Sequence, residues 1–180
     1  MTDRIKFSRA GALRVTGHRV HVCRDSDAAT VTDGVMAVMF PWEPSLRECG
    51  DLPRSACSAV REMAARPARS RGYIGLADAL QWSISDRVGA YGHDAQVCLG
   101  HIFDRKLIRA SLCALSDLGT PSDAELLVEA THYGDKWMLR MSSMRVVAVA
   151  CQLDPRLVTV KDCGNEPMPT RPRSAYLRAA

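Results

Sequence analysis

Histidine and cysteine, which supply many metal ligands and nucleophiles, come close together at two places in this chain of 180 residues. In the first place, His18, His21 and Cys23 lie near the start, and with Cys49 or Cys57 they would supply four zinc ligands. No pair with the spacing CxxC or HxxxH occurs, however, and strand alternation would point His18 away from the other two. We therefore expect surface histidines beside a buried thiol, and no metal.

The second group holds the residue types of a thiol nucleophile with its base and acid, namely Cys98 or Cys113 with His101 and Asp94. Nothing in the sequence orders these groups, and Cys113 follows Leu112 in a helical pattern, as a packing residue would. Phosphate-binding loops are absent, since neither GxxxxGK nor GxGxxG occurs. We expect a protein that is not an enzyme and uses no cofactor; a small cysteine-dependent hydrolase is the alternative.

Length and composition favour one domain. With 47% hydrophobic residues among 180, such a chain buries roughly 70% of its unfolded surface in a sizeable core. The formal net charge of +4 is modest, but six cations stand against Asp3 alone in Met1–Arg24, and five arginines against Glu62 in Arg54–Arg71. Arginine clusters suit phosphate or carboxylate contacts, while a genome that favours arginine explains them equally well.

The seven cysteines lack paired spacing, and no export signal precedes them. They fit a reducing cytosol better than a disulfide framework, so we expect a cytoplasmic protein. No window approaches the roughly 20 apolar residues that a membrane span needs, so no membrane partner is expected.

The clearest helical pattern lies over Asp104–Asp117. Asp104 is a good N-cap, and Gly119 followed by Pro121 ends the pattern. The apolar positions recur at helical spacing, at Leu107, Ile108, Ser111 and Leu115. The opposite side would expose three cations, Arg105, Lys106 and Arg109.

A second helix is predicted over Pro53–Arg66, with Pro53 in its first turn and Pro67 just beyond its end. Its apolar stripe is thin, and Arg54 and Arg61, seven residues apart, share another face. The stretch Ile74–Val88 fits both helix and strand, and we expect helix in its first half.

Alternation and turn residues predict strands over much of the remaining chain. The Asp33-Gly34 dipeptide is typical of a tight hairpin between two of them, whereas Arg69–Gly72 is predicted as a loop. The expected strands are Arg19–Arg24, Ala28–Thr32, Val35–Phe40, Ala95–Phe103, Glu125–Thr131, Lys136–Met141 and Arg145–Cys151.

Together these elements predict an α+β fold, with antiparallel sheets and two or three helices packed on one side. We expect a single domain over residues 1–152. Residues 153–180 would follow as one strand, Leu157–Lys161, and a mobile tail rich in proline and arginine, Asn165–Arg173.

Three short motifs carry a resemblance to a known family. They are Ile102-Phe103-Asp104 followed by a leucine-rich helix, Val31-Thr32-Asp33-Gly34 at a strand turn, and Met141-Ser142-Ser143-Met144-Arg145. In these three motifs, the chain resembles a domain of the bacterial DNA sliding clamp, which is the β subunit of the replicative polymerase. That family has an apolar-Phe-Asn strand end, an Ala-Thr-Asp-Gly turn and a final Met-Pro-Met-Arg strand. This chain lacks the proline of the last motif and has room for about one of the three domains of an ordinary clamp.

The resemblance implies a DNA-associated protein that contacts the DNA backbone, replication proteins or both, and that forms homo-oligomers. The DNA-facing residues would be the helix cations Arg54, Arg61, Arg105, Lys106 and Arg109. Flexible methionines suit a groove for apolar peptides, so the partner-binding residues would be Met141, Met144 and Arg145. The alternative is a protein-interaction module of phage or plasmid type, an inhibitor or accessory factor, that does not bind nucleic acid.

Overall fold

The structure is a computed structural model that describes residues 21–25, 27–32, 34–42, 44, 54–84, 95–153 and 167–172. For residues 54–57 it describes the backbone and not the side chains. The strand predicted at Leu157–Lys161 lies outside the described residues. Within the described part, the fold is α+β, as predicted, with antiparallel sheets and three helices.

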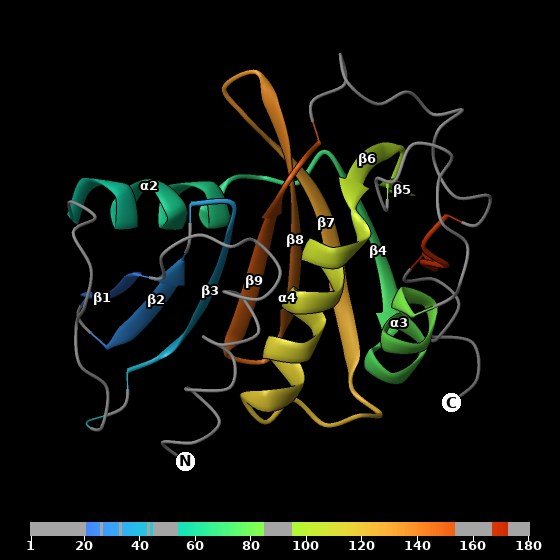
Figure 1. Cartoon of the computed structure of the whole chain (residues 1–180), viewed down its shortest axis with the longest axis horizontal. Helices are drawn as coiled ribbons and strands as arrows, with labels where there is room; N and C mark the ends of the chain where they lie inside the picture. Colours follow the sequence, from blue (N-terminus) through green and yellow to red (C-terminus); the bar gives the residue numbers. More distant parts are fainter. Residues whose placement is uncertain are drawn as a thin grey trace.

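Seven antiparallel strands form the main sheet, in the order β1-β2-β3-β9-β8-β7-β4 (Figure 1). β3 pairs directly with β9, with Met36 opposite Ala150, so strands from the two ends of the chain meet in the middle of one sheet. The strands are β1 His21–Asp25, β2 Ala28–Thr32, β3 Met36–Pro41, β4 Ser70–Gly75, β7 Glu125–Tyr133, β8 Lys136–Ser143 and β9 Val146–Cys151.

The β2–β3 hairpin forms where the sequence predicts it. Gly34 has a φ of +89°, a conformation that glycine adopts without steric cost. The Thr32 hydroxyl accepts from the Gly34 N–H at 3.1 Å and donates to the Met36 carbonyl at 2.7 Å, which ties the turn to both strands.

The β7–β8–β9 ladder is also confirmed, with β7 and β8 two residues longer than predicted and β9 one residue shorter. Gly134, with a φ of +62°, forms the first turn. The second turn is Met144-Arg145 rather than the predicted Ser-Ser pair, since Ser142 and Ser143 still pair with Val147 and Val146.

Helix α4, Arg105–Asp117, begins and ends as predicted. The Asp104 carboxylate accepts a hydrogen bond from the Lys106 N–H at 2.8 Å, so it satisfies one free donor of the first turn. At the other end, the Thr120 N–H bonds the Leu115 carbonyl at 3.1 Å, and the Gly119 N–H bonds the Ser116 carbonyl at 3.0 Å. With Gly119 at a φ of +94°, this is a Schellman motif.

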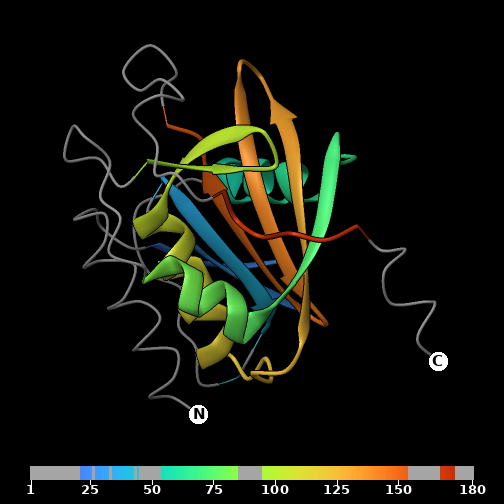
Figure 2. The ribbon, with the colours of Figure 1, turned by 90° about the vertical axis from the view of Figure 1, so that its right-hand side faces the viewer.

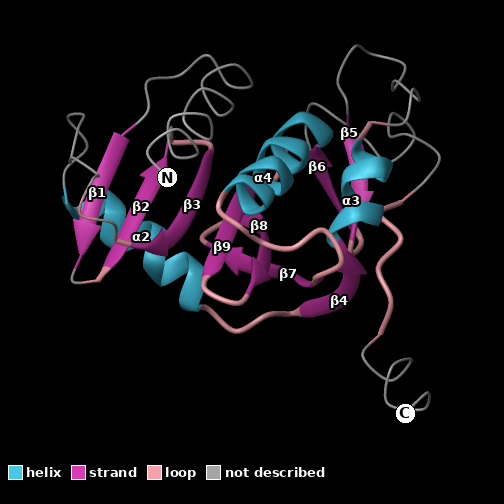
Figure 3. Ribbon diagram, turned by 90° about the horizontal axis from the view of Figure 1, so that it is seen from below, coloured by secondary structure: helices cyan, strands magenta, loops and turns pink. Residues whose placement is uncertain are grey.

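The helices lie on both faces of the sheet (Figure 3). α4 and α3, Leu76–Ser83, pack against each other and cover one face, where alternate residues of β9 such as Ala148 are buried beneath them. α2, Arg54–Ala65, lies on the other face, where Val60 and Met63 approach Val149. The prediction that all helices pack on one side of the sheet is confirmed for α3 and α4 and is wrong for α2.

Two predicted local structures are wrong. Ala95–Phe103 is a hairpin rather than one strand, formed by β5 Ala95–Cys98 and β6 His101–Asp104, because Leu99 and Gly100 both adopt positive φ, 51° and 84°. Arg69–Gly72 is not a loop, since Ser70–Gly75 forms β4 and pairs with β7 along its whole length. Tertiary pairing overrides the low strand propensity of its two glycines.

The described part of the predicted tail is extended, but it is hydrogen-bonded to the rest of the fold and not detached from it. Residues 167–172 lie across β4 and the β5–β6 hairpin (Figure 2). The side chain of Met168 in this segment is buried. No helix in the described part of the chain is both long and apolar enough to cross a bilayer.

The expectation that the cysteines form no disulfide is wrong for Cys23, which is disulfide-bonded, while Cys98, Cys113 and Cys151 are not in disulfides. Disulfide formation depends on the distance between side chains in the fold and not on regular spacing in the sequence.

Candidate functional site

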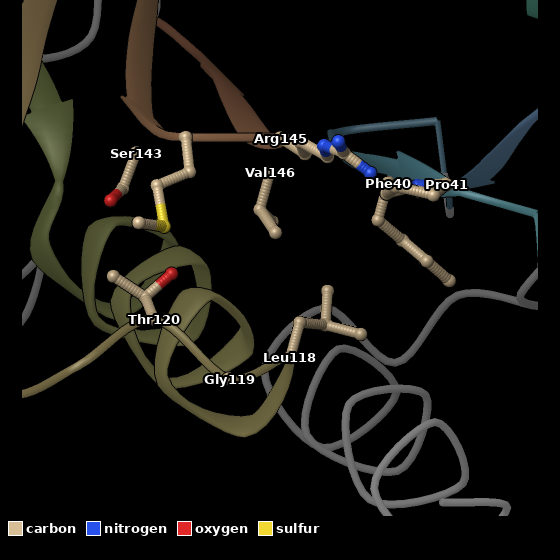
Figure 4. A pocket seen from close by; sticks show the side chains of 9 residues that line it. Phe40, Pro41, Leu118, Gly119, Thr120, Ser143, Arg145 and Val146 are labelled. Carbon is tan, nitrogen blue, oxygen red and sulfur yellow. The ribbon is translucent and has the colours of Figure 1, made fainter.

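Three segments that are distant in sequence meet around an apolar pocket of about 460 Å³ (Figure 4). The end of β3 supplies Phe40 and Pro41, and the C-terminal end of α4 supplies Leu118–Thr120. The β8–β9 turn supplies Ser143–Val146. Because each segment is fixed by the sheet or by a helix end, the pocket is largely preformed.

The lining combines a buried apolar floor with an exposed rim. Phe40 and Val146 are buried, and Leu118 is half-buried against the core. Met144 is 92% exposed, and its neighbour Arg145 is exposed as well. The pocket thus places a flexible apolar side chain and a guanidinium beside an apolar hollow, which suits an apolar ligand that also carries a negative charge.

The position of Leu118 follows from the end of α4. The Schellman motif reverses the chain at Gly119, so Leu118 remains beside the helix while Thr120 turns back toward Leu115. On the opposite rim, Met144 has a φ of +48°, a conformation that costs a non-glycine residue about 1 kcal/mol. Such strain is often found at functional sites.

Two of the three predicted partner-binding residues line this pocket. Met144 and Arg145 do, whereas Met141 is fully buried beneath the helices and does not reach the surface. Strand alternation explains the difference, because Met141 lies on the face of β8 that packs toward α4, together with Leu139. The prediction for Met141 is therefore wrong.

The predicted DNA-facing cations do not form one surface. Arg105 is only 7% exposed, contrary to the prediction, because it lies on the same helical stripe as Ile108 and Leu112. Lys106 and Arg109 are exposed on the outer side of α4. These two lie across the sheet from α2.

On α2, Arg61 forms an ion pair with Asp25 of β1. The side chain of Arg54 lies outside the described residues. The described cations of the two helices therefore lie on opposite faces of the sheet and cannot contact one straight polyanion together.

A charged cluster on the α2 face escaped prediction. Arg140 of β8 lies opposite Glu129 of β7, and its guanidinium bonds one carboxylate oxygen at 2.9 Å through Nε and 2.5 Å through Nη2. Nη1 donates to the carbonyls of Ala64 and, at 3.2 Å, of Arg66, where α2 ends. Arg140 therefore fastens the C-terminal end of α2 to the sheet. Strand register, which the sequence does not give, was needed to find this pair.

The described members of the predicted thiol–histidine group, Cys98, Cys113 and His101, are not arranged as a nucleophile with its base. Cys98 is completely buried, and burial raises its pKa to about 12, so it remains a thiol. Burial also raises the pKa of the Cys113 thiol. The ring of His101 stacks on Trp137 with centroids 3.7 Å apart instead of facing a thiol. Asp94 lies outside the described residues.

The zinc alternative finds no support in the described side chains. Cys23 is disulfide-bonded and cannot serve as a thiolate ligand. No cluster of three or more His, Cys, Asp or Glu that could hold a metal occurs among the residues described. His18, Cys49 and the Cys57 side chain lie outside that set.

Comparison with solved structures returns the resemblance seen in the sequence. The chain is similar to the DNA polymerase sliding clamp from Bacillus subtilis, with a TM-score of 0.43 and 11% identity over 84% of this chain and 63% of the clamp. It is similar to a DnaN sliding clamp (DNA polymerase III subunit beta) from Bartonella birtlesii bound to griselimycin, with a TM-score of 0.40 and 16% identity over 84% of this chain and 64% of that one.

A third similar structure is the DnaN clamp of Bartonella birtlesii LL-WM9, with a TM-score of 0.40 and 14% identity over 91% of this chain and 68% of the clamp. The chain thus spans a little under two thirds of the first two clamps. No protein-family profile and no curated protein sequence matches it.

Proposed function

We propose that this protein is a non-enzymatic, clamp-like interaction module that binds a short peptide of a replication protein in the pocket beside Met144. One observation carries the proposal: the end of β3, the end of α4 and the β8–β9 turn converge on an apolar hollow whose rim holds the most exposed large apolar side chain of the described residues. Exposed apolar groups beside a concave surface are typical of sites that bind a partner.

The size and charge of the pocket specify the ligand. At about 460 Å³, it lies within the roughly 300–1,000 Å³ range of small-ligand sites, so it accepts a few side chains and not a folded domain. Phe40, Leu118 and Val146 favour large apolar side chains, and Arg145 favours a neighbouring carboxylate. The ligand class is therefore an extended peptide with apolar anchors next to an acidic residue.

The test uses a fluorescent peptide that carries adjacent leucine and phenylalanine beside an aspartate, and measures its anisotropy with the full chain. Met144→Asp should weaken binding by at least about tenfold, because it puts a charge at the apolar rim. Aspartate tolerates positive φ well, so the fold is retained. Arg145→Glu should weaken binding through charge repulsion.

Ile84→Asp is the matched control. Ile84 is the other large apolar side chain that is exposed among the described residues, and it lies outside the pocket. If Ile84→Asp weakened binding as much as Met144→Asp, or if neither changed it, the pocket would not be the peptide site.

A second candidate function, contact with the DNA backbone, is favoured by the exposed Lys106 and Arg109 on the outer side of α4. Binding to duplex DNA should weaken as the salt concentration rises. The double variant Lys106→Glu with Arg109→Glu should make the slope of log binding constant against log salt concentration shallower by about 1.8, which is about 0.9 for each lost phosphate contact. Lys136→Glu, at the start of β8, is the control. Absence of DNA binding at low salt would exclude this second function and favour a protein-interaction module that does not bind nucleic acid.

A further inference from the structure

The face of the main sheet that carries α2 is only partly covered by this helix. Beneath α2, Met138 and Val149 are buried, with exposed fractions of 4% and 2%. Further along the same face, four cross-strand neighbours are only half-buried. We call them the open row: Tyr73 of β4, Leu127 of β7, Ser142 of β8 and Val147 of β9.

Arg171 extends the open row beyond β4. Its N–H donates to the Tyr73 carbonyl at 2.8 Å, and the Tyr73 N–H donates to the Arg171 carbonyl at 2.8 Å, so the two residues lie directly opposite each other. Figure 2 shows residues 167–172 passing beside β4. Directly opposed residues of an antiparallel pair carry their side chains on the same face. The Arg171 side chain therefore lies next to Tyr73 on the α2 face.

Two further arginines lie at the start of β4. The Arg69 N–H bonds the Ala130 carbonyl at 2.9 Å, so the ladder with β7 already includes Arg69. Because strand residues alternate, Arg69 and Arg71 share the face of Tyr73, at steps of about 7 Å. Arg69 and Arg171 are exposed, and neither forms an ion pair with a residue that the structure describes. Cations thus flank Tyr73 along its strand and across it.

The acids of β7 on this face leave these arginines as the main free charge. Glu129 is buried, and its Oε2 already accepts two bonds from Arg140, at 2.5 Å and 2.9 Å. Its Oε1 lies 3.8 Å from Arg71, whose side chain remains 61% exposed. Glu125 is exposed and lies opposite the last residue of β4. Positive charge therefore gathers at the start of β4, and Glu125 marks the other end.

An aromatic ring, an apolar neighbour and arginines on one open sheet face suit single-stranded nucleic acid. Bases stack on aromatic side chains of a sheet with little dependence on sequence. Guanidinium groups bind phosphate oxygens through two donors at once. Duplex DNA keeps its bases paired and offers none to Tyr73, and an acidic peptide would use the arginines but not the ring. The combination favours a single strand over both.

We propose that the open row and its arginines bind single-stranded nucleic acid, with one base stacked on Tyr73 and phosphates at Arg69, Arg71 and Arg171. This surface lies across the sheet from α4 and its cations. The lining of the Met144 pocket contains none of its residues. The proposal therefore stands or fails separately from the two functions proposed above.

The test measures the anisotropy of a fluorescent oligothymidylate of about 12 nucleotides, a length within the range that one protein domain covers, with the full chain. Tyr73→Ala should weaken binding by at least about fivefold, because the stacking platform is lost. Tyr73→Phe keeps the ring and should bind like the natural chain. An oligouridylate of the same length, measured in parallel, shows whether the preferred strand is DNA or RNA.

Salt dependence tests the arginines. Arg171→Gln should make the slope of log binding constant against log salt concentration shallower by about 0.7, and the addition of Arg69→Gln should bring the change to about 1.4. Both side chains are exposed, so these variants keep the test decisive if Tyr73→Ala does not fold. Lys136→Gln is the matched control, because Lys136 is exposed on the same face but opposite Tyr133, about 20 Å from the open row along β7. It should leave the slope unchanged.

Three results would overturn the proposal. The first is a folded Tyr73→Ala variant that binds oligothymidylate as well as the natural chain. The second is an equal change of slope for Lys136→Gln and Arg171→Gln, which would show attraction without a defined site. The third is competition by duplex DNA or polyglutamate, at equal charge, as strong as that of unlabelled oligothymidylate.

Discussion

Replacement of Glu129 by glutamine tests how the structure holds α2 on the sheet. The Glu129 side chain is 6% exposed and that of Arg140 is 13% exposed, so the pair is largely removed from water. Glutamine keeps the shape of the side chain and one acceptor oxygen but removes the negative charge of the carboxylate. Arg140 would keep its bonds to the end of α2, yet its charge would be buried without compensation.

The expected loss is about 3 kcal/mol, the lower end of the roughly 3–5 kcal/mol found when one partner of a buried ion pair is removed. Arg71, whose side chain is 61% exposed at 3.8 Å, adds little to the pair. With a urea m-value of about 2 kcal/mol/M, Glu129→Gln should lower the unfolding midpoint by about 1.5 M.

Glu62→Gln is the matched control, because Glu62 pairs with Arg66 at 2.9 Å on the exposed side of α2. The same chemical change there should cost about 0.3–0.5 kcal/mol, or about 0.2 M of urea. Unfolding is followed by tryptophan fluorescence and far-ultraviolet circular dichroism, whose coincidence checks two-state behaviour. If both variants shift the midpoint equally, burial does not set the strength of this pair. Glu129→Leu combined with Arg140→Met should cost less than Glu129→Gln, since no charge is then left unpaired.

Three further predictions concern single groups. Asp104→Ala should lower the free energy of unfolding by about 1 kcal/mol in urea, because the first turn of α4 loses its cap, and Asp104→Ser should restore most of it. Burial and then the neighbouring His132 lower the pKa of His101, so the stability that depends on neutral His101 is full above the unfolded pKa of about 6.5 and is lost as the pH falls below it. The urea midpoint should therefore be lower at about pH 5.5 than at about pH 7.5, and His101→Phe, which keeps a ring on Trp137, should reduce this difference. Cys98 should resist alkylation in the folded chain, because burial raises its pKa to about 12, and it should react after denaturation. Mass spectrometry measures the labelling, and labelling of Cys98 in folded chains would contradict its burial.

Local chemistry made several elements predictable. The N-cap at Asp104, the glycine at 119 and the Asp33-Gly34 turn act through neighbours a few residues away, and the structure confirms each of them. The Leu99-Gly100 turn escaped prediction because leucine at positive φ gives no sequence signal.

The candidate site was only partly accessible from the sequence. Met144 and Arg145 were predicted from their motif and lie on the pocket rim, but Phe40 and Leu118 come from distant segments that only the fold brings there. Arg105 was predicted as exposed because it is charged, although its helical position places it on the stripe of Ile108.

The sequence by itself determined the fold class and the ends of the main helix, because caps, turns and periodicity are short-range effects. Only the tertiary structure decided that α2 lies across the sheet from α4, that Glu129 meets Arg140, and that residues 167–172 close the edge at Tyr73. These features depend on strand order and register, which join residues far apart in the chain. Register is selected by the packing of the whole sheet and not by any local run of residues.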